Sequence, residues 1–223
     1  MSSNLTEKLV VSIILDNSYV LESLGLCDRL KSFLETIQTY TDSMPDKDRL
    51  DIQIERFDGL RSATVKKFDE DTFDTDIACQ GFPLLDRTLS KSLADLATHL
   101  NQLNTAKQPL YKPWFIIVSS GLSYDALSAF KDAHIMDQIN QLTVFPFLMD
   151  DTFLGENLIP MNRLKPFMVI KEHQLNALAE WLKTMMSERL GKTASEKMRL
   201  DKDSLKDWIY LWDFIAGKTS QRR

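Results

Sequence analysis

Three nearly continuous apolar runs predict strands that are buried on both faces of a sheet. They span Leu9–Leu15, interrupted only by Ser12, then Trp114–Val118 and Leu142–Leu148. A strand covered on both faces has no solvent side, so a short uninterrupted run is typical of a parallel sheet. Pro146 fits the third run poorly because it has no N–H to donate to a neighbouring strand.

Between these runs, apolar residues recur every three or four positions, which predicts amphipathic helices. The expected helices cover residues 22–39, 85–103, 123–139 and 174–190, and a further short strand covers 167–170. Strands that alternate with helices imply parallel strands joined by right-handed crossovers.

Residues 50–55 alternate strictly between apolar and polar types, which predicts a half-covered strand near an edge of the sheet. Asp58-Gly59 is a turn signal, and residues 63–68 can return as the second strand of a hairpin. The expected fold class is therefore α/β: a doubly wound, mostly parallel six-stranded sheet with one antiparallel edge strand.

The C-terminal segment has a different pattern from the rest of the chain. Residues 191–202 are polar and predict a linker after a domain of residues 1–190, and residues 203–223 form a separate tail. Within the tail we expect a C-terminal amphipathic helix over 203–216, whose apolar stripe includes Leu205, Trp208, Ile209 and Trp212. The stripe either packs on the parent domain or docks onto a partner or second subunit, since aromatic residues dominate interface hot spots.

Composition narrows the classes of partner. The net charge of −5 and the pI of about 5.3 argue against nucleic acid, which needs clustered Lys and Arg. No apolar run approaches the roughly 20 residues that span a bilayer, and the N-terminus lacks a signal-peptide pattern, so we expect no membrane contact and a cytoplasmic protein. Cys27 and Cys79 fit no zinc motif and make no disulfide framework, which favours a reducing compartment.

Candidate chemistry lies where two central strands end. In a doubly wound sheet, ligands bind beyond the carboxyl ends of the strands, at the point where the strand order reverses. Asp16-Asn17-Ser18-Tyr19-Val20 follows the first apolar run, and Ser119-Ser120-Gly121 follows the second. We expect these two loops to face each other.

These motifs carry a resemblance to a known family. Asp16-x-Ser18 after a buried strand, Gln80-Gly81-Phe82-Pro83-Leu84 before a helix, and Ser119-Ser120-Gly121 occur in the order found in von Willebrand factor A domains, over residues 8 to about 190. The chain looks most similar to bacterial tellurium-resistance proteins of the TerY type, which share the Lys112-Pro113-Trp114 lead into the central strand. In this family the three loops form a metal-ion-dependent adhesion site.

The chain departs from the family's ligand pattern. Val20 stands in place of a Ser, Phe82 in place of a Thr, and Ser120 in place of an Asp. Mg²⁺ requires about six oxygen ligands in octahedral geometry, so we expect no cofactor; a surviving Mg²⁺ site would use Asp16, Ser18 and Ser120. Instead, Asp16 is expected to accept hydrogen bonds from neighbouring backbone amides.

The degenerate site remains a candidate surface for binding a partner. Its expected rim consists of Asp16, Ser18, Tyr19, Val20, Phe82, Ser120 and Tyr124. The resemblance implies a protein-binding scaffold or adaptor, not an enzyme, in a bacterial stress-response, signalling or defence system with kinase and phosphatase partners.

Two alternatives stay open. One is a metal-assisted hydrolase around Asp16, and the other is an assembly subunit that docks through its C-terminal helix, including as a homodimer. No Walker motif, dinucleotide fingerprint or nucleophile elbow is present. His99, His134 and His173 lie far apart in or beside helical patterns, which is typical of surface residues.

Overall fold

The computed structural model describes most of the chain. It covers residues 6–57, 62–68, 70, 73–74, 77–120, 128–138, 140–149, 168–169, 175–193, 196 and 209–210. The strands are β1 Leu9–Asp16, β2 Leu50–Phe57, β3 Ser62–Lys66, β4 Trp114–Ser119, β5 Thr143–Leu148, β6 Met168–Val169 and β7 Ile209–Tyr210. The helices are α1 Tyr19–Ser23, α2 Cys27–Ser43, the short 3₁₀ turn η1 Lys47–Arg49, α3 Leu85–Thr105, α4 Ser128–Gln138 and α6 Leu175–Leu190.

The strands form one mixed sheet in the order β3-β2-β1-β4-β5-β6-β7. The five inner strands are parallel, and β3 and β7 pair antiparallel at the two edges. The doubly wound α/β architecture is therefore confirmed. The sheet has seven strands in the described residues instead of the expected six, because a second antiparallel strand is added beside β6. The strand order reverses between β1 and β4, so the switch point lies where the sequence places it.

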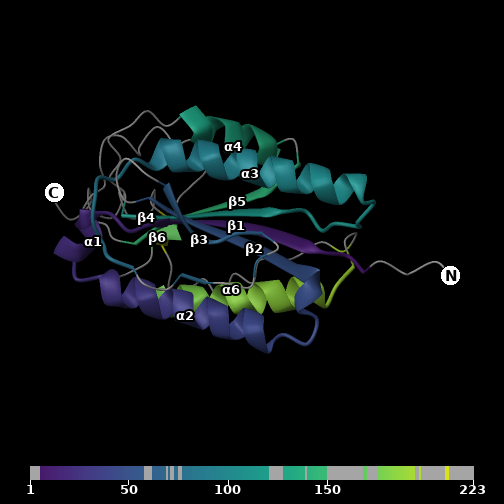
Figure 1. The fold of residues 1–223 in the computed structure, drawn as a ribbon, viewed down its shortest axis with the longest axis horizontal. Coiled ribbons are helices and arrows are strands. Elements are labelled where there is room, and N and C mark those ends of the chain that lie inside the picture. The colour runs from purple at the N-terminus through teal and green to yellow at the C-terminus, as the bar shows by residue number, and fades with distance from the viewer. Residues whose placement is uncertain are drawn as a thin grey trace, which may run out of the picture.

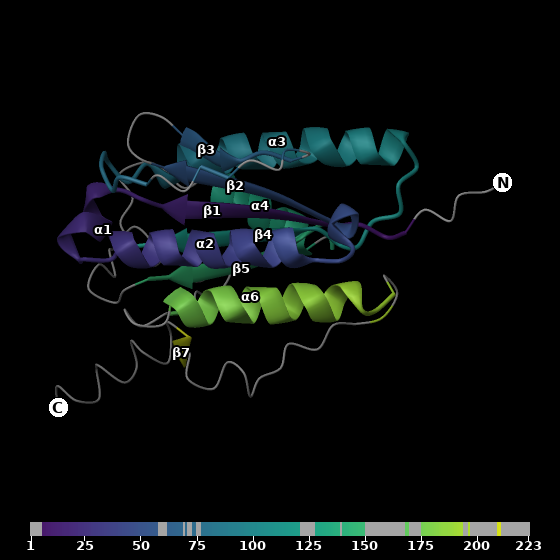
Figure 2. The same cartoon turned by 60° about the horizontal axis from the view of Figure 1, so that its bottom comes forward.

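Helices cover both faces of the sheet (Figure 1). α3 and α4 lie on one face, and α2 and α6 lie on the other (Figure 2). Side chains of β1 alternate between two apolar clusters: Leu9, Val11 and Ile13 pack toward α2 and α6, whereas Val10 and Ile14 pack toward α3 and α4. Burial on both faces explains why the strand is apolar at almost every position.

The first expected helix is split in two. α1 ends at Ser23 and α2 begins at Cys27, because Gly25 takes a left-handed backbone conformation with φ of +68°. The Leu26 N–H donates to the carbonyl of Leu21 at 2.9 Å, which closes the end of α1. Helices commonly end at a glycine in this conformation. The sequence did not predict the break because the helical spacing of apolar residues continues across Gly25.

The prediction of a half-covered β2 is wrong. Its polar residues Asp51, Gln53 and Glu55 are as buried as Ile52 and Ile54. α3 covers this face and meets it with polar side chains, so a polar stripe faces a helix instead of solvent.

The C-terminal tail also differs from expectation. Ile209 and Tyr210, within the expected helix, form β7 and pair with Val169 and Met168 of β6. This pairing is within the same chain. Leu205, Trp208 and Trp212 lie outside the described residues, and the division into residues 1–190, a linker over 191–202 and a tail remains a prediction. Among the described residues, no helix is long and apolar enough to cross a membrane.

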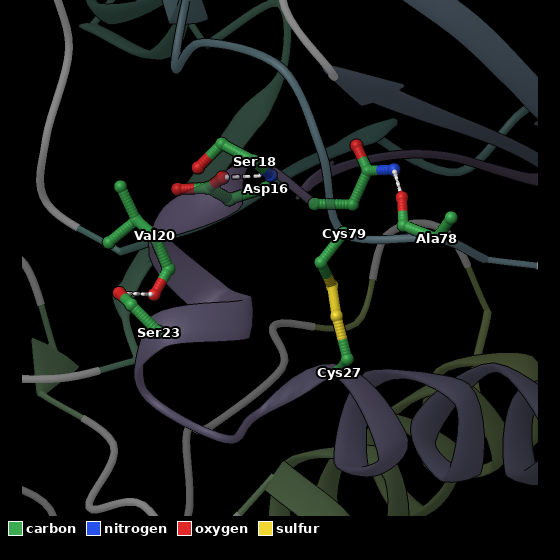
Figure 3. Close-up of a disulfide and its surroundings, with 8 residues drawn as sticks. Asp16, Ser18, Val20, Ser23, Cys27, Ala78 and Cys79 are labelled. Carbon is green, nitrogen blue, oxygen red and sulfur yellow. Dashed lines mark hydrogen bonds between the residues drawn. A yellow bond between two sulfur atoms is a disulfide. The ribbon is translucent and has the colours of Figure 1, made fainter.

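Cys27 at the start of α2 and Cys79 in the loop before α3 form a disulfide, with Cα atoms 6.0 Å apart (Figure 3). The expectation that Cys27 and Cys79 make no disulfide framework did not anticipate this bond. The bond links residues 52 positions apart, a separation from which sequence spacing cannot predict pairing.

We expect the double substitution C27S/C79S to lower the free energy of unfolding by about 4 kcal/mol, because the cross-link closes a loop of roughly 50 residues in the unfolded chain. Urea denaturation under non-reducing conditions measures this change. A reductant should destabilise the wild-type protein and leave the double variant unchanged. A wild-type protein that is insensitive to reductant would contradict the assignment.

Candidate functional site

Three loops meet at the carboxyl edge of the sheet, as the sequence predicts. The first follows β1 at Asp16–Ser18, the second precedes α3 at residues 77–84, and the third follows β4 at Ser119–Ser120. The pairing of β1 with β4 brings the first and third loops together. The strands themselves therefore fix the core of the site.

The Asp16 carboxylate bridges the ends of β1 and β4. The backbone N–H of Ser18 donates to Oδ1 of Asp16 at 3.0 Å (Figure 3), and the backbone N–H of Ser120 donates to Oδ2 at 2.8 Å. The Ser120 hydroxyl also donates to Oδ2. Asp16, Ser18 and Ser120 are all fully buried. The structure confirms the expectation that the Asp16 carboxylate accepts hydrogen bonds from backbone amides.

Complete burial raises the pKa of the Asp16 carboxyl above its ordinary value of 3.8. Hydrogen bonds from Ser120 and Ser18 oppose this effect by stabilising the anion. Desolvation is the larger effect, so ionising this carboxyl group costs more free energy here than in water.

The loop of residues 77–84 is anchored to the end of β1. The Asn17 side-chain amide donates to the carbonyl of Ala78 at 3.3 Å, and the Gln80 N–H donates to the carbonyl of Asn17 at 3.0 Å. The Tyr19 N–H donates to the carbonyl of Gly81 at 3.1 Å, and Gly81 has a φ of +78° that favours glycine. These bonds place Phe82 directly beside α1.

The donor set does not fit a Mg²⁺ ion. Both Asp16 oxygens already accept hydrogen bonds from N–H and O–H donors, and the Phe82 side chain has no oxygen to offer as a ligand. Among the described residues, no group of three or more His, Cys, Asp or Glu side chains is arranged to hold a metal. We therefore derive no chemistry through a metal at this edge.

An exposed aromatic pair lies over this buried core. Tyr19 is 40% exposed and Phe82 is 59% exposed, and their rings make an edge-to-face contact with centroids 6.1 Å apart. Val20 is buried in the core with Asp16, so neither can contact a partner as the expected rim required. Ser18 and Ser120 are equally inaccessible. Tyr124 lies outside the described residues.

A second polar cluster, between α3 and β2, was missed by the sequence analysis. His99 is buried and its Nε2 lies 2.5 Å from Oδ2 of Asp51, while its ring stacks on Phe68. The Lys91 ammonium donates to Glu55 at 2.7 Å and to Asp95 at 2.8 Å. The spacing of Lys91, Asp95 and His99 on one face of α3 was the available signal, opposite the polar stripe of β2. His134 is half-buried on α4, and His173 lies outside the described residues.

Comparison with known proteins identifies the fold. No family model and no curated protein matches the sequence. The chain is similar in structure to the von Willebrand factor domain of the type V pili tip protein Mfa5 from Porphyromonas gingivalis, with a TM-score of 0.58 and 10% identity, covering 88% of this chain and 99% of that one. It is also similar to the SpRpn10 VWA domain, with a TM-score of 0.55 and 9% identity over 87% and 100% of the two chains. Manganese-loaded TRAP of Plasmodium vivax gives a TM-score of 0.53 and 10% identity over 77% and 72%.

We expect the stability of the wild-type protein, relative to a D16N variant, to fall as pH rises above about 4. The pKa of Asp16 is raised in the folded state, so the folded protein binds this proton more tightly than the unfolded chain does. The resulting contribution to the free energy of unfolding is fully present below the ordinary pKa, and it is lost as pH rises through the pKa of the folded state. Urea denaturation of both proteins between about pH 4 and pH 8 measures the difference, whose slope is at most about 1.4 kcal/mol per pH unit. A difference that grows in favour of the wild type with rising pH would contradict a raised pKa.

Proposed function

We propose that this chain, which has the fold of a von Willebrand factor A domain, is a protein-binding module that engages its partner without a metal ion. The binding surface is the aromatic rim, defined here as Tyr19 and Phe82 at the carboxyl edge of the sheet. The observation that carries the proposal is the exposure of this edge-to-face pair over a buried polar core. Exposed aromatic residues are enriched in the hot spots of protein interfaces.

The rim is held in one arrangement before a partner arrives. Tyr19 begins α1, and Phe82 lies in the loop of residues 77–84, which hydrogen bonds and the Cys27–Cys79 disulfide attach to the rest of the domain. A surface that is already ordered loses little conformational entropy on binding. This supports recognition by a small, stable patch.

The solved structures of similar fold offer an analogy for this proposal. They include the pili tip protein Mfa5 and the pilus adhesin SpaC from Lactobacillus rhamnosus GG. The analogy supports a role in binding and does not identify the surface or the partner. A scaffold or adaptor role in a bacterial stress-response, signalling or defence system, with kinase or phosphatase partners, stays a prediction from the sequence resemblance.

The alternative of a metal-assisted hydrolase is less well supported. Asp16, Ser18 and Ser120 are fully buried, and both Asp16 oxygens already accept hydrogen bonds from within the chain. A catalytic group must reach substrate at hydrogen-bond distance. The assembly alternative also loses part of its basis, since Ile209 and Tyr210 pair with β6 of the same chain.

We expect the substitution F82A to weaken partner binding at least tenfold, because truncating an aromatic hot spot costs about 2 kcal/mol or more. The matched control is I135A on α4, which removes a similarly exposed apolar side chain (53% exposed) elsewhere. Affinity capture with quantitative mass spectrometry, using wild type, F82A and I135A as baits, identifies proteins that depend on Phe82. Titration calorimetry then gives their affinities.

The same capture is repeated with EDTA. Retention of the Phe82-dependent partner supports metal-independent recognition, and its loss on chelation contradicts that part of the proposal. A partner set that F82A and I135A affect equally would contradict the aromatic rim as the binding surface. Equal melting temperatures of the three proteins confirm that the baits are folded.

A further inference from the structure

A cavity of about 420 Å³ lies between α3 and the β2–β3 hairpin, on the opposite side of β2 from α2. Its lining includes Gln53 and Glu55 from β2, Phe68 after β3, and Lys91, Asp95 and His99 from α3. The cavity is therefore polar on one wall and aromatic on another. It is separate from the aromatic rim.

Two hydrogen-bond acceptors in this lining have no partner. The Gln53 amide donates to Oε1 of Glu55 at 3.1 Å and to Oδ2 of Asp95 at 3.3 Å, which fixes its carbonyl oxygen on the other side. That carbonyl oxygen and Oε2 of Glu55 make no hydrogen bond to any residue that the structure describes, although both side chains are almost completely buried. Buried acceptors without donors cost free energy. A bound group with N–H donors would satisfy them.

The charges of the lining also favour a cation. Glu55 and Asp95 contribute two negative charges and share the single Lys91 ammonium. Lys67 also lines the cavity, and its ammonium pairs with Glu70 at 3.2 Å. One more positive charge would balance the two carboxylates.

Lys91 shows how this wall receives a cation. Its ammonium lies 2.7 Å from Oε1 of Glu55 and 2.8 Å from Oδ2 of Asp95, and partial burial, which lowers its pKa, is outweighed by these two hydrogen bonds so that the pKa is raised. The Lys91 side chain is 40% exposed, so it can shift and admit a second cation beside it.

We propose that this cavity binds a small organic cation with at least two N–H donors, of the guanidinium or primary ammonium class. The donors contact the free oxygens of Gln53 and Glu55, and the positive charge balances Glu55 and Asp95. A planar guanidinium suits the flat wall provided by Phe68, which stacks on His99 with ring centroids 4.3 Å apart.

The test uses methylguanidinium as the probe and methylurea as its uncharged analogue of the same shape. Two-dimensional NMR of the isotope-labelled full chain follows the backbone amides of β2 and α3 during titration. We expect saturable shifts at these amides with methylguanidinium, and binding of methylurea at least about tenfold weaker, because it lacks the charge. Equal shifts with both probes, or no saturable shift, would show a cavity that holds solvent only and would overturn the proposal.

Three variants locate the binding site. E55Q removes a charge from the wall and should weaken methylguanidinium binding at least about tenfold. T98R places a guanidinium from an exposed position of α3 at the cavity and should block the probe without altering the buried wall. E35Q, the same chemical change as E55Q on the exposed face of α2, should bind like the wild type. If E55Q fails to fold, undiminished binding by T98R still overturns the proposal, and F82A, which tests the aromatic rim, should leave the probe's affinity unchanged.

Discussion

The buried Asp16 carboxylate is the interaction on which the carboxyl edge of this domain depends. It lies at the point where the strand order reverses, and it accepts hydrogen bonds from the backbone of both adjacent strand ends. A buried carboxylate needs hydrogen-bond donors, and here two backbone amides and a serine hydroxyl supply them. The donors that stabilise the anion belong to the loops themselves. The same hydrogen bonds therefore compensate the charge and fix the positions of the loops.

A series of contacts connects the end of β1 to the aromatic rim at the surface. Asn17 attaches the loop of residues 77–84, the Cys27–Cys79 disulfide attaches that loop to α2, and Phe82 then lies against Tyr19. These contacts within the chain hold the loops together. Asp16, Ser18 and Ser120 are buried supports, and Tyr19 and Phe82 are the large apolar side chains exposed here among the described residues.

The polar side chains of β2 are also buried, and their hydrogen-bond partners are side chains instead of backbone amides. Asp51, Gln53 and Glu55 are buried under α3, and each is compensated by a side chain from that helix or from the hairpin. Among the described residues, the Gln53 carbonyl oxygen and Oε2 of Glu55 lack a hydrogen-bond partner, and both side chains line a cavity. The domain thus has two separate surfaces with distinct chemistry, an apolar aromatic edge and a polar cavity that favours cations.

The sequence by itself determined the class of fold, because strands buried on both faces must be apolar throughout and helices between them must be amphipathic. It also placed the Asp16 and Ser120 loops together, since the carboxyl ends of adjacent parallel strands necessarily meet at one edge. What it could not determine depends on contacts between residues distant in the chain. The partner of the polar stripe on β2, the pairing of Cys27 with Cys79, the burial of Val20 and the strand at Ile209–Tyr210 each depend on which element lies opposite. Local periodicity records that a face is polar, whereas only the tertiary structure decides whether water or another side chain faces it.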